Sequence, residues 1–114
     1  NLHTIYDFQH MLQANGVSYI EPDVSNCGGI TVWMKVAKLA EAKNLPVTSH
    51  GVHDIHVHLL GAVPNASYLE VHGFGLERFI LEPLVVKDGF ALAGEAPGHG
   101  IDFNWDGLCV HTSD

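Results

Sequence analysis

Cysteine and positive charge are both scarce in this sequence. Cys27 and Cys109 are the only cysteines, and 5 Lys and Arg residues face 13 Asp and Glu residues, which gives a formal net charge of −8. Two cysteines so far apart exclude a disulfide framework and a thiolate zinc site. A negative net charge opposes the phosphate neutralisation on which most nucleic-acid affinity depends, so nucleic acid is excluded as a partner.

Long apolar segments are absent as well. No apolar run approaches the roughly 20 residues of a membrane span, and the start has no positively charged, apolar leader. We therefore expect no membrane partner and, with two reduced thiols, a cytoplasmic protein. The sequence starts at Asn1 without an initiator methionine and enters a helical pattern at once, so we expect it to be part of a longer chain.

What the sequence does contain is an alternation of helical and strand patterns. Apolar spacing and caps predict helices over 4–15, 30–44 and 54–62, and short β-branched or aromatic runs predict strands over 17–20, 45–49 and 67–71. Such alternation is typical of α/β proteins with parallel strands and right-handed crossovers. Beyond it, Lys87-Asp88-Gly89 predicts the turn of an antiparallel hairpin, followed by a Gly/Pro-rich tail.

Three polar residues fall at the carboxyl ends of the three predicted strands. Asp23, His50 and Glu70 are separated by 50 − 23 = 27 and 70 − 50 = 20 residues, each about one βα unit. In a parallel array these ends share one face, where ligands bind. Neighbouring strands lie about 4.8 Å apart, so Asp23 can reach His50. A carboxylate there would fix the imidazole tautomer and raise its basicity, as a general base requires.

The segments "EPDVSNCGGIT" and "TSHGVHDIHVHLLGAVPNASYLE", with the tail "APGHGIDFNWDGL", resemble the mandelate racemase subgroup of the enolase superfamily, the mandelate racemase/muconate lactonizing enzyme family. The resemblance implies the C-terminal part of a TIM-like (β/α)7β barrel, incomplete in this chain. Residues 1–80 would be the last βα units of that enolase C-terminal domain-like fold. Residues 81–114 would be a hairpin and tail that pack on a capping domain.

The resemblance also implies a chemistry. In this family a divalent metal, normally Mg²⁺, assists removal of the proton α to a carboxylate, and an enediolate forms. By the same resemblance His50 is the general acid/base, Asp23 its partner, and Glu70 the protonated carboxyl that donates a hydrogen bond to the enediolate. We expect Glu70 to keep its proton through burial away from cations.

Sugar-acid dehydratases are the members that this chain resembles most. The implied reaction is dehydration of an aldonate or aldarate to a 2-keto-3-deoxy acid, with His50 also protonating the departing 3-hydroxyl. The family's three metal-binding acids have no counterpart between Asn1 and Asp23, so this chain is expected to supply no metal ligand, and the ligands are expected before Asn1. The full-length parent is expected to be a homo-oligomer.

Two other functions stay open. A racemase or epimerase of 2-hydroxy acids such as mandelate uses the same dyad with a second base, which in this family lies outside the sequence given. A non-catalytic, truncated remnant that folds only with other chains is the alternative from another class, because three parallel strands cannot close a barrel and leave an exposed edge.

The remaining histidines of the His-rich segment give weaker predictions. His53 and His56 could share a helix face, but only Asp54 is near enough in sequence to complete a zinc site, and zinc needs three or four ligands. His56 and His58 diverge on a helix. We therefore expect histidines that line or cap the helix, and a contact with substrate for His53, which lies in the loop above the barrel.

Overall fold

The computed structural model describes residues 2–73 and 76–109, and the chain divides between His72 and Gly73 into two compact units. The first unit contains the helices α1, α2 and α3, and the second contains η1, β1, β2 and α4. Residues 73–80 belong to the second unit, whereas the sequence analysis groups them with the first. The expected packing of residues 81–114 on a capping domain stays a prediction. None of the described helices is long and apolar enough to cross a bilayer.

Helix α1, Ile5–Gln13, forms where the sequence predicts it. Thr4 is its N-cap and makes a reciprocal capping box with Asp7, because each side chain accepts from the backbone N–H of the other. These bonds satisfy two of the amide donors that a helix leaves unpaired at its start. Phe8 and Leu12, one turn apart on the same face, are buried.

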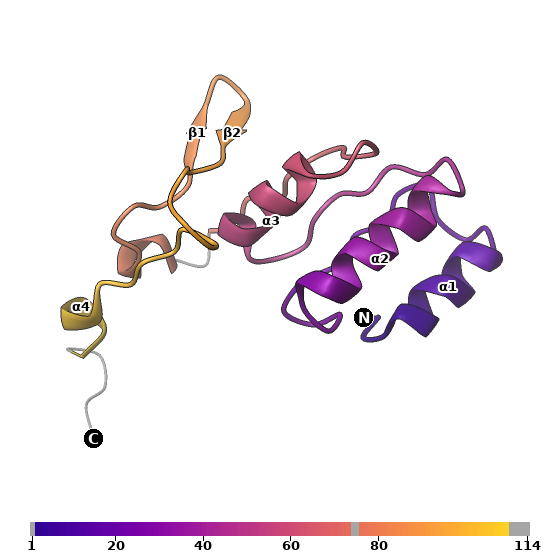
Figure 1. The fold of residues 1–114 in the computed structure, drawn as a ribbon, viewed down its shortest axis with the longest axis horizontal. Helices are drawn as coiled ribbons and strands as arrows, with labels where there is room; N and C mark the ends of the chain where they lie inside the picture. The colour runs from indigo at the N-terminus through magenta and orange to yellow at the C-terminus, as the bar shows by residue number, and fades with distance from the viewer. Residues whose placement is uncertain (1, 74–75, 110–114) are drawn as a thin grey trace. The chain divides into compact units, whose positions relative to one another are not determined.

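Helices α2, Ile30–Glu41, and α3, His53–Gly61, confirm the other two predicted helices. α1 and α2 lie side by side in Figure 1 and are in contact. The buried face of α2 carries residues at helical spacing, namely Trp33, Val36, Ala37 and Ala40. α3 is buried more widely: its buried apolar residues are Val57, Leu59 and Leu60, and its buried polar residues are His53, Asp54 and His56.

The three predicted strands are reduced to single parallel bridges, Ile20 with Val47 and Val47 with Ala66. We call the chain around these three residues the parallel array. The predicted order and parallel direction are confirmed, but the predicted strand lengths are wrong. Ile20 donates to Pro46 O and accepts from Thr48 N, at 3.1 and 2.9 Å. The next donor toward the same neighbour would be residue 22, which is a proline and has no N–H, so the ladder stops.

The core of the first unit surrounds this array. Val47, its middle residue, is fully buried, as is Trp33 of α2. Trp33 Nε1 donates to Pro22 O at 2.9 Å, so that the bulkiest core side chain also holds the segment that follows Ile20. A buried indole N–H needs such an acceptor. The array and α2 are therefore fixed to one another just before Asp23.

The second unit contains the predicted hairpin. β1, Val85–Lys87, pairs antiparallel with β2, Phe90–Leu92, and the turn residues Asp88 and Gly89 both have positive φ, 52° and 81°. Positive φ at both central positions is what a two-residue hairpin turn requires. Two helices there were not predicted, the 3₁₀-helix η1, Leu76–Phe79, and the short α4, Trp105–Cys109.

Candidate active site

The three predicted site residues all follow the bridge residues of the parallel array. Asp23 comes three residues after Ile20, His50 three after Val47 and Glu70 four after Ala66. All three therefore leave the array at its carboxyl end, the end at which parallel α/β folds place their chemistry. The backbone thus brings the predicted set to one face.

Asp23 is held in a tight turn by its own neighbours. Its Oδ1 accepts from Ser25 N and Ser25 Oγ, at 2.8 and 2.6 Å, and its Oδ2 accepts from Asn26 Nδ2 at 2.7 Å. Burial raises the pKa of Asp23, but the hydrogen bonds from Ser25, Asn26 and His50 together outweigh it, so the pKa lies below its ordinary value. Asp23 is therefore a fixed carboxylate at neutral pH.

His50 faces this carboxylate. Its Nδ1 lies 3.4 Å from Asp23 Oδ2, and its side chain is 53% exposed while that of Asp23 is 12% exposed. The distance is long for a hydrogen bond, as is common for catalytic pairs without substrate. An imidazole with Nδ1 on a partly buried carboxylate keeps Nε2 for proton transfer. The predicted dyad is thus brought together.

Gly51 permits this approach. Its φ is +76°, and a Cβ at this position would lie 2.9 Å from Asp23 Oδ2 and 3.4 Å from Oδ1. Positive φ and the lack of space both favour glycine here. Sequence analysis did not single out Gly51, although a glycine directly after the predicted base was a signal that could have found it.

Glu70 is tied to the segment that carries His50. Its Oε2 accepts from Gly51 N at 3.2 Å, and its own N–H donates to Ser49 Oγ at 2.9 Å. Glu70 Oε2 also lies 2.7 Å from His72 Nε2, and 41% of the Glu70 side chain is exposed. The expected burial of Glu70 is therefore not what the structure shows, and an imidazole, which is a cation only when protonated, lies next to the carboxylate.

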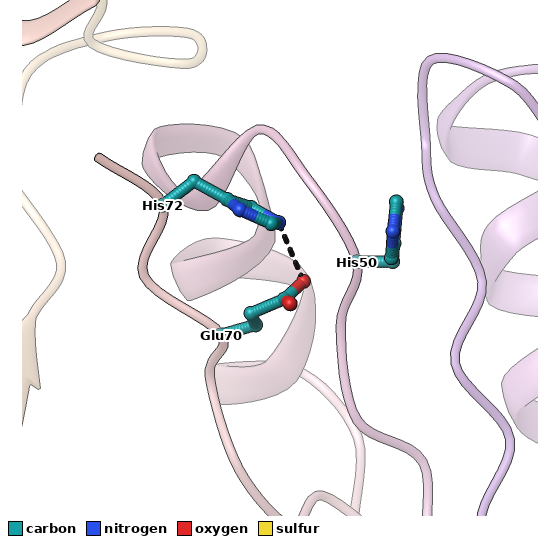
Figure 2. Close-up of side chains that lie close together, drawn as sticks. All are labelled: His50, Glu70 and His72. Atoms are coloured by element: carbon teal, nitrogen blue, oxygen red, sulfur yellow. Dashed lines mark ion pairs between the residues drawn. The ribbon is translucent and has the colours of Figure 1, made fainter. Parts of the chain in front are cut away.

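His72 is the residue of this face that sequence reasoning missed. Figure 2 shows it beside Glu70, with the ring of His50 opposite, and the two imidazole centroids are 5.5 Å apart at 70°. Residues two apart in an extended segment point to the same side, so the spacing Glu70-x-His72 was the available signal. One potential ligand atom from each of the three residues lies within 4.8 Å of the other two.

His53 contacts this group through the backbone of His72. It is the first residue of α3 and is buried, its Nδ1 accepts from His72 N at 3.3 Å, and its Nε2 lies 3.5 Å from Asp54 Oδ2. Both ring nitrogens therefore have neighbours within the chain. The expected contact between His53 and substrate stays a prediction.

His56 is fully buried and connects two loops. Its Nε2 accepts from Val24 N at 3.1 Å, and its Nδ1 lies 2.8 Å from Val52 O, to which it donates. Burial lowers the pKa of His56 and outweighs the hydrogen bonds that act in the opposite direction. His56 thus agrees with the expectation of a histidine that lines the helix, and it holds the residue after Asp23.

A cleft of about 280 Å³ opens beside the dyad. Asp23 and His50 contribute its polar wall, and the rest is mainly apolar, from α1 and the segments before and after it: Leu2, Phe8, Met11, Val17, Tyr19 and Ile20, with Glu21 and Asn26. A small polar group could reach His50 from this side.

The face offers no ligand set suited to Mg²⁺ among the described residues. Mg²⁺ requires an octahedron of oxygen atoms, mostly carboxylate, water and phosphate. The candidate cluster of His50, Glu70 and His72 has two imidazoles and one carboxylate. These residues therefore do not fit Mg²⁺, and the expectation that the magnesium ligands lie before Asn1 stays a prediction.

Comparison with known proteins gives a consistent match. The model of the family described as enolase C-terminal domain-like matches residues 1–107. The 3,6-anhydro-α-L-galactonate cycloisomerase of Streptomyces coelicolor is 51% identical over 108 residues, which is 95% of this chain and 30% of the relative. The chain thus spans less than a third of the length of this relative.

Solved structures give the same result. A racemase from Streptomyces coelicolor with bound magnesium superposes with a TM-score of 0.91 at 47% identity, covering 96% of this chain and 30% of that one. L-talarate dehydratase from Polaromonas sp., complexed with Mg and L-glucarate, superposes with a TM-score of 0.87 at 30% identity, covering 95% and 30%.

Proposed function

The chain belongs to the enolase C-terminal domain-like family, and from this premise we propose that it carries the general base of an enzyme that removes the proton α to the carboxylate of a sugar acid. The predicted resemblance to the mandelate racemase subgroup is confirmed by its relatives, which include sugar-acid dehydratases, a cycloisomerase and a racemase. The activity is proposed for the full-length protein, because this chain spans 30% of the length of the cycloisomerase.

The observation that carries the proposal is the Asp23–His50 pair, with Glu70 held next to it. Asp23 is fixed as a carboxylate by Ser25 and Asn26, and Nδ1 of His50 lies 3.4 Å from it. Gly51 N–H joins Glu70 to the same segment. A solvent-accessible imidazole oriented by a partly buried acid, with a further carboxyl group beside it, is an arrangement suited to proton abstraction.

The proposed reaction is a β-elimination. His50 takes the proton from C2 of the acid, the electron pair of that C–H bond forms the C2=C3 bond of an enol, and the C3–O bond breaks. The oxygen at C3 leaves with a proton, for which the imidazolium of His50 is the donor. The enol then becomes a 2-keto-3-deoxy acid when a proton adds to C3. Glu70 is proposed to donate to the carboxylate oxygen on which negative charge develops.

The leaving oxygen decides between two reactions. If it is a free hydroxyl, water is lost and the reaction is a dehydration. If it belongs to an ether that bridges C3 and C6, the same bond cleavage opens the ring and the product is an isomer. The 51% identical cycloisomerase acts on a 3,6-anhydro acid, so this substrate class is the second candidate.

The magnesium ion is proposed to come with the rest of the protein. The structural relatives contain magnesium, and the described residues of this chain do not form a site for it. We propose ligands outside this sequence, where the ion would stabilise negative charge on the substrate carboxylate. The proposal includes a small-molecule acid as partner, a cytoplasmic location and a homo-oligomeric parent.

The test uses the full-length protein with Mg²⁺ in D₂O and a panel of aldonates, aldarates, 3,6-anhydro-aldonates and mandelate. Proton NMR detects the new C3 methylene, which carries one deuterium taken from D₂O, and mass spectrometry detects the loss of water. A methylene with loss of water identifies a dehydratase, and a methylene without it identifies a cycloisomerase. Deuterium at C2 alone would favour the racemase alternative.

His50→Asn is the decisive variant, because an amide cannot take the proton, and it should abolish C2 exchange. His58→Asn, on α3 and outside the proposed site, is the control and should keep the activity. No reaction across the panel, with His50→Asn and the parent indistinguishable, would leave the non-catalytic remnant as the better description.

A further inference from the structure

His50, Glu70 and His72 together form a possible set of metal ligands, a role that the proposed reaction does not give them. The reaction needs His50 and Glu70, whereas His72 has no part in it. One donor atom of each residue lies within 4.8 Å of the others, and Nε2 of His72 is already 2.7 Å from Oε2 of Glu70 (Figure 2). Two imidazoles and one carboxylate also form the protein ligands of many catalytic zinc sites.

The chemistry of this set selects the cation. Imidazole suits Zn²⁺, Ni²⁺, Cu²⁺ and Fe²⁺, whereas Mg²⁺ prefers oxygen. Bonds of about 2.0–2.2 Å to a tetrahedral Zn²⁺ require ligand atoms a little over 3 Å apart. Glu70 Oε2 and His72 Nε2 are already 2.7 Å apart, and the 53% exposed side chain of His50 has room to adjust toward them.

The backbone below the three ligands is held by hydrogen bonds from one segment to the next. Ser49 Oγ accepts from Glu70 N at 2.9 Å, directly before His50. His53 Nδ1 accepts from His72 N at 3.3 Å. The two segments that carry the ligands are therefore fixed side by side, and only side chains need to move when a cation binds.

The carboxylate of Asp23, next to His50, gives the cluster a second feature that is common in metal sites. Histidines that bind zinc commonly donate their other ring N–H to a carboxylate, which fixes the ring and raises its basicity. Asp23 Oδ2 lies 3.4 Å from His50 Nδ1 and has a pKa below its ordinary value. The acid that orients His50 as a base thus also prepares its Nε2 as a metal ligand.

We propose that His50, Glu70 and His72 form a binding site for a borderline transition-metal cation such as Zn²⁺, separate from the magnesium site, and that the bound cation blocks proton abstraction. Binding follows from the geometry alone, and the effect on turnover rests on the proposed function. The cation occupies the lone pair of His50 that would take the substrate proton, so zinc and turnover exclude one another.

Binding is tested first, on the full-length protein with saturating Mg²⁺. Co²⁺ is titrated as a spectroscopic substitute for Zn²⁺, and d–d absorption with an imidazole signature that Zn²⁺ displaces is the expected result. His72→Gln should weaken Zn²⁺ binding, measured by calorimetry, by a factor of about 10 or more, because a ligand is lost. His58→Gln, a histidine of α3 outside the cluster, is the matched control and should bind as the parent does.

Turnover is tested on the same proteins. Zn²⁺ should inhibit the parent and the His58→Gln control, excess Mg²⁺ should not restore activity, and Zn²⁺ should inhibit His72→Gln, relative to the rate of that variant without Zn²⁺, much less. Should His72→Gln fold poorly, His72→Asn serves as the second variant. Inhibition that Mg²⁺ reverses and that both His72 variants leave unchanged would put the zinc ion at the magnesium site and overturn the proposal. Co²⁺ binding in a protein inactive on every substrate would overturn only the proposed function.

Discussion

Gly51 is the residue through which the dyad can be tested without touching either catalytic group. Gly51→Ala adds a methyl group that would lie 2.9 Å from Asp23 Oδ2, at a φ of +76°. Because the carboxylate must move away from His50, we expect turnover to fall by about 100-fold, as displacements of about 1 Å can cause. Steady-state kinetics of the full-length enzyme give the measurement.

Gly89 provides the control for this experiment. Its φ is +81°, and nothing lies within 4 Å of an added Cβ. Gly89→Ala should carry a similar conformational cost of about 1 kcal/mol, measured by denaturation, and leave turnover unchanged. Equal turnover in the two alanine variants would show that the approach of Gly51 to Asp23 has no role in catalysis.

His56 allows a prediction about pH. Because burial lowers the pKa of His56 below its ordinary value of 6.5, the unfolded chain binds a proton more readily than the folded one. Neutral, buried His56 therefore makes its full contribution to the free energy of unfolding above pH 6.5. This contribution decreases as the pH falls below 6.5. Urea denaturation at pH 7.5 and 5.5 should show this loss, reduced in His56→Gln, which does not titrate.

The variants His56→Gln and His56→Asn test the hydrogen bond that His56 Nε2 accepts from Val24 N. Gln is long enough to accept from Val24 N as Nε2 does, whereas Asn is not, and a buried N–H without a partner costs about 1–3 kcal/mol. We expect His56→Asn to be the less stable variant at pH 7.5. Equal stability of the two would contradict a role for the bond to Val24.

At the scale of single elements, the start of α1 is the clearest case of local sequence determining structure. Thr4→Ala removes the side chain that accepts from Asp7 N, and we expect a loss of about 1 kcal/mol in the free energy of unfolding. Thr31→Ala is the matched control, because Thr31 is exposed near the start of α2, which has no side-chain cap. If both variants unfold at the same urea concentration, the capping box does not contribute.

Elements with a local signal were predicted, and those that depend on distant partners were not. Caps and apolar spacing predicted three helices, and Asp88-Gly89 predicted the hairpin turn. The strand lengths were wrong because pairing in the parallel array depends on its neighbours, and Pro22 removes the next donor. η1 and α4 are too short for a periodic pattern to be seen.

The candidate site shows the same division. The spacing of Asp23, His50 and Glu70 after successive strands predicted that they share a face, and the structure places them there. The contact of Glu70 with His72 is not part of that pattern, because both residues belong to one extended segment, where only their spacing of two signals it. The expected burial of Glu70 was wrong, because 41% of its side chain is exposed.

At the scale of the whole molecule, the chain exposes apolar surface that a self-sufficient domain would cover. Several large side chains are more than half exposed, among them Tyr68, Phe90 and Trp105 at 72%, 73% and 66%. Within residues 2–73, the Ile20 and Ala66 segments each pair on one side only, which leaves backbone donors and acceptors at two edges of the array. Unpaired edges and apolar surface both favour association.

We therefore expect these 114 residues, produced by themselves, to self-associate at micromolar concentration. Sedimentation velocity at several concentrations should show a weight-average mass that rises with concentration, and a dye for exposed apolar surface should bind. The full-length protein is the control, because its additional chain can cover the same faces. A monomer that unfolds in one sharp, cooperative transition would instead mean that residues 1–114 bury enough surface to fold alone, and the exposed edges of the array would then be free to bind another strand.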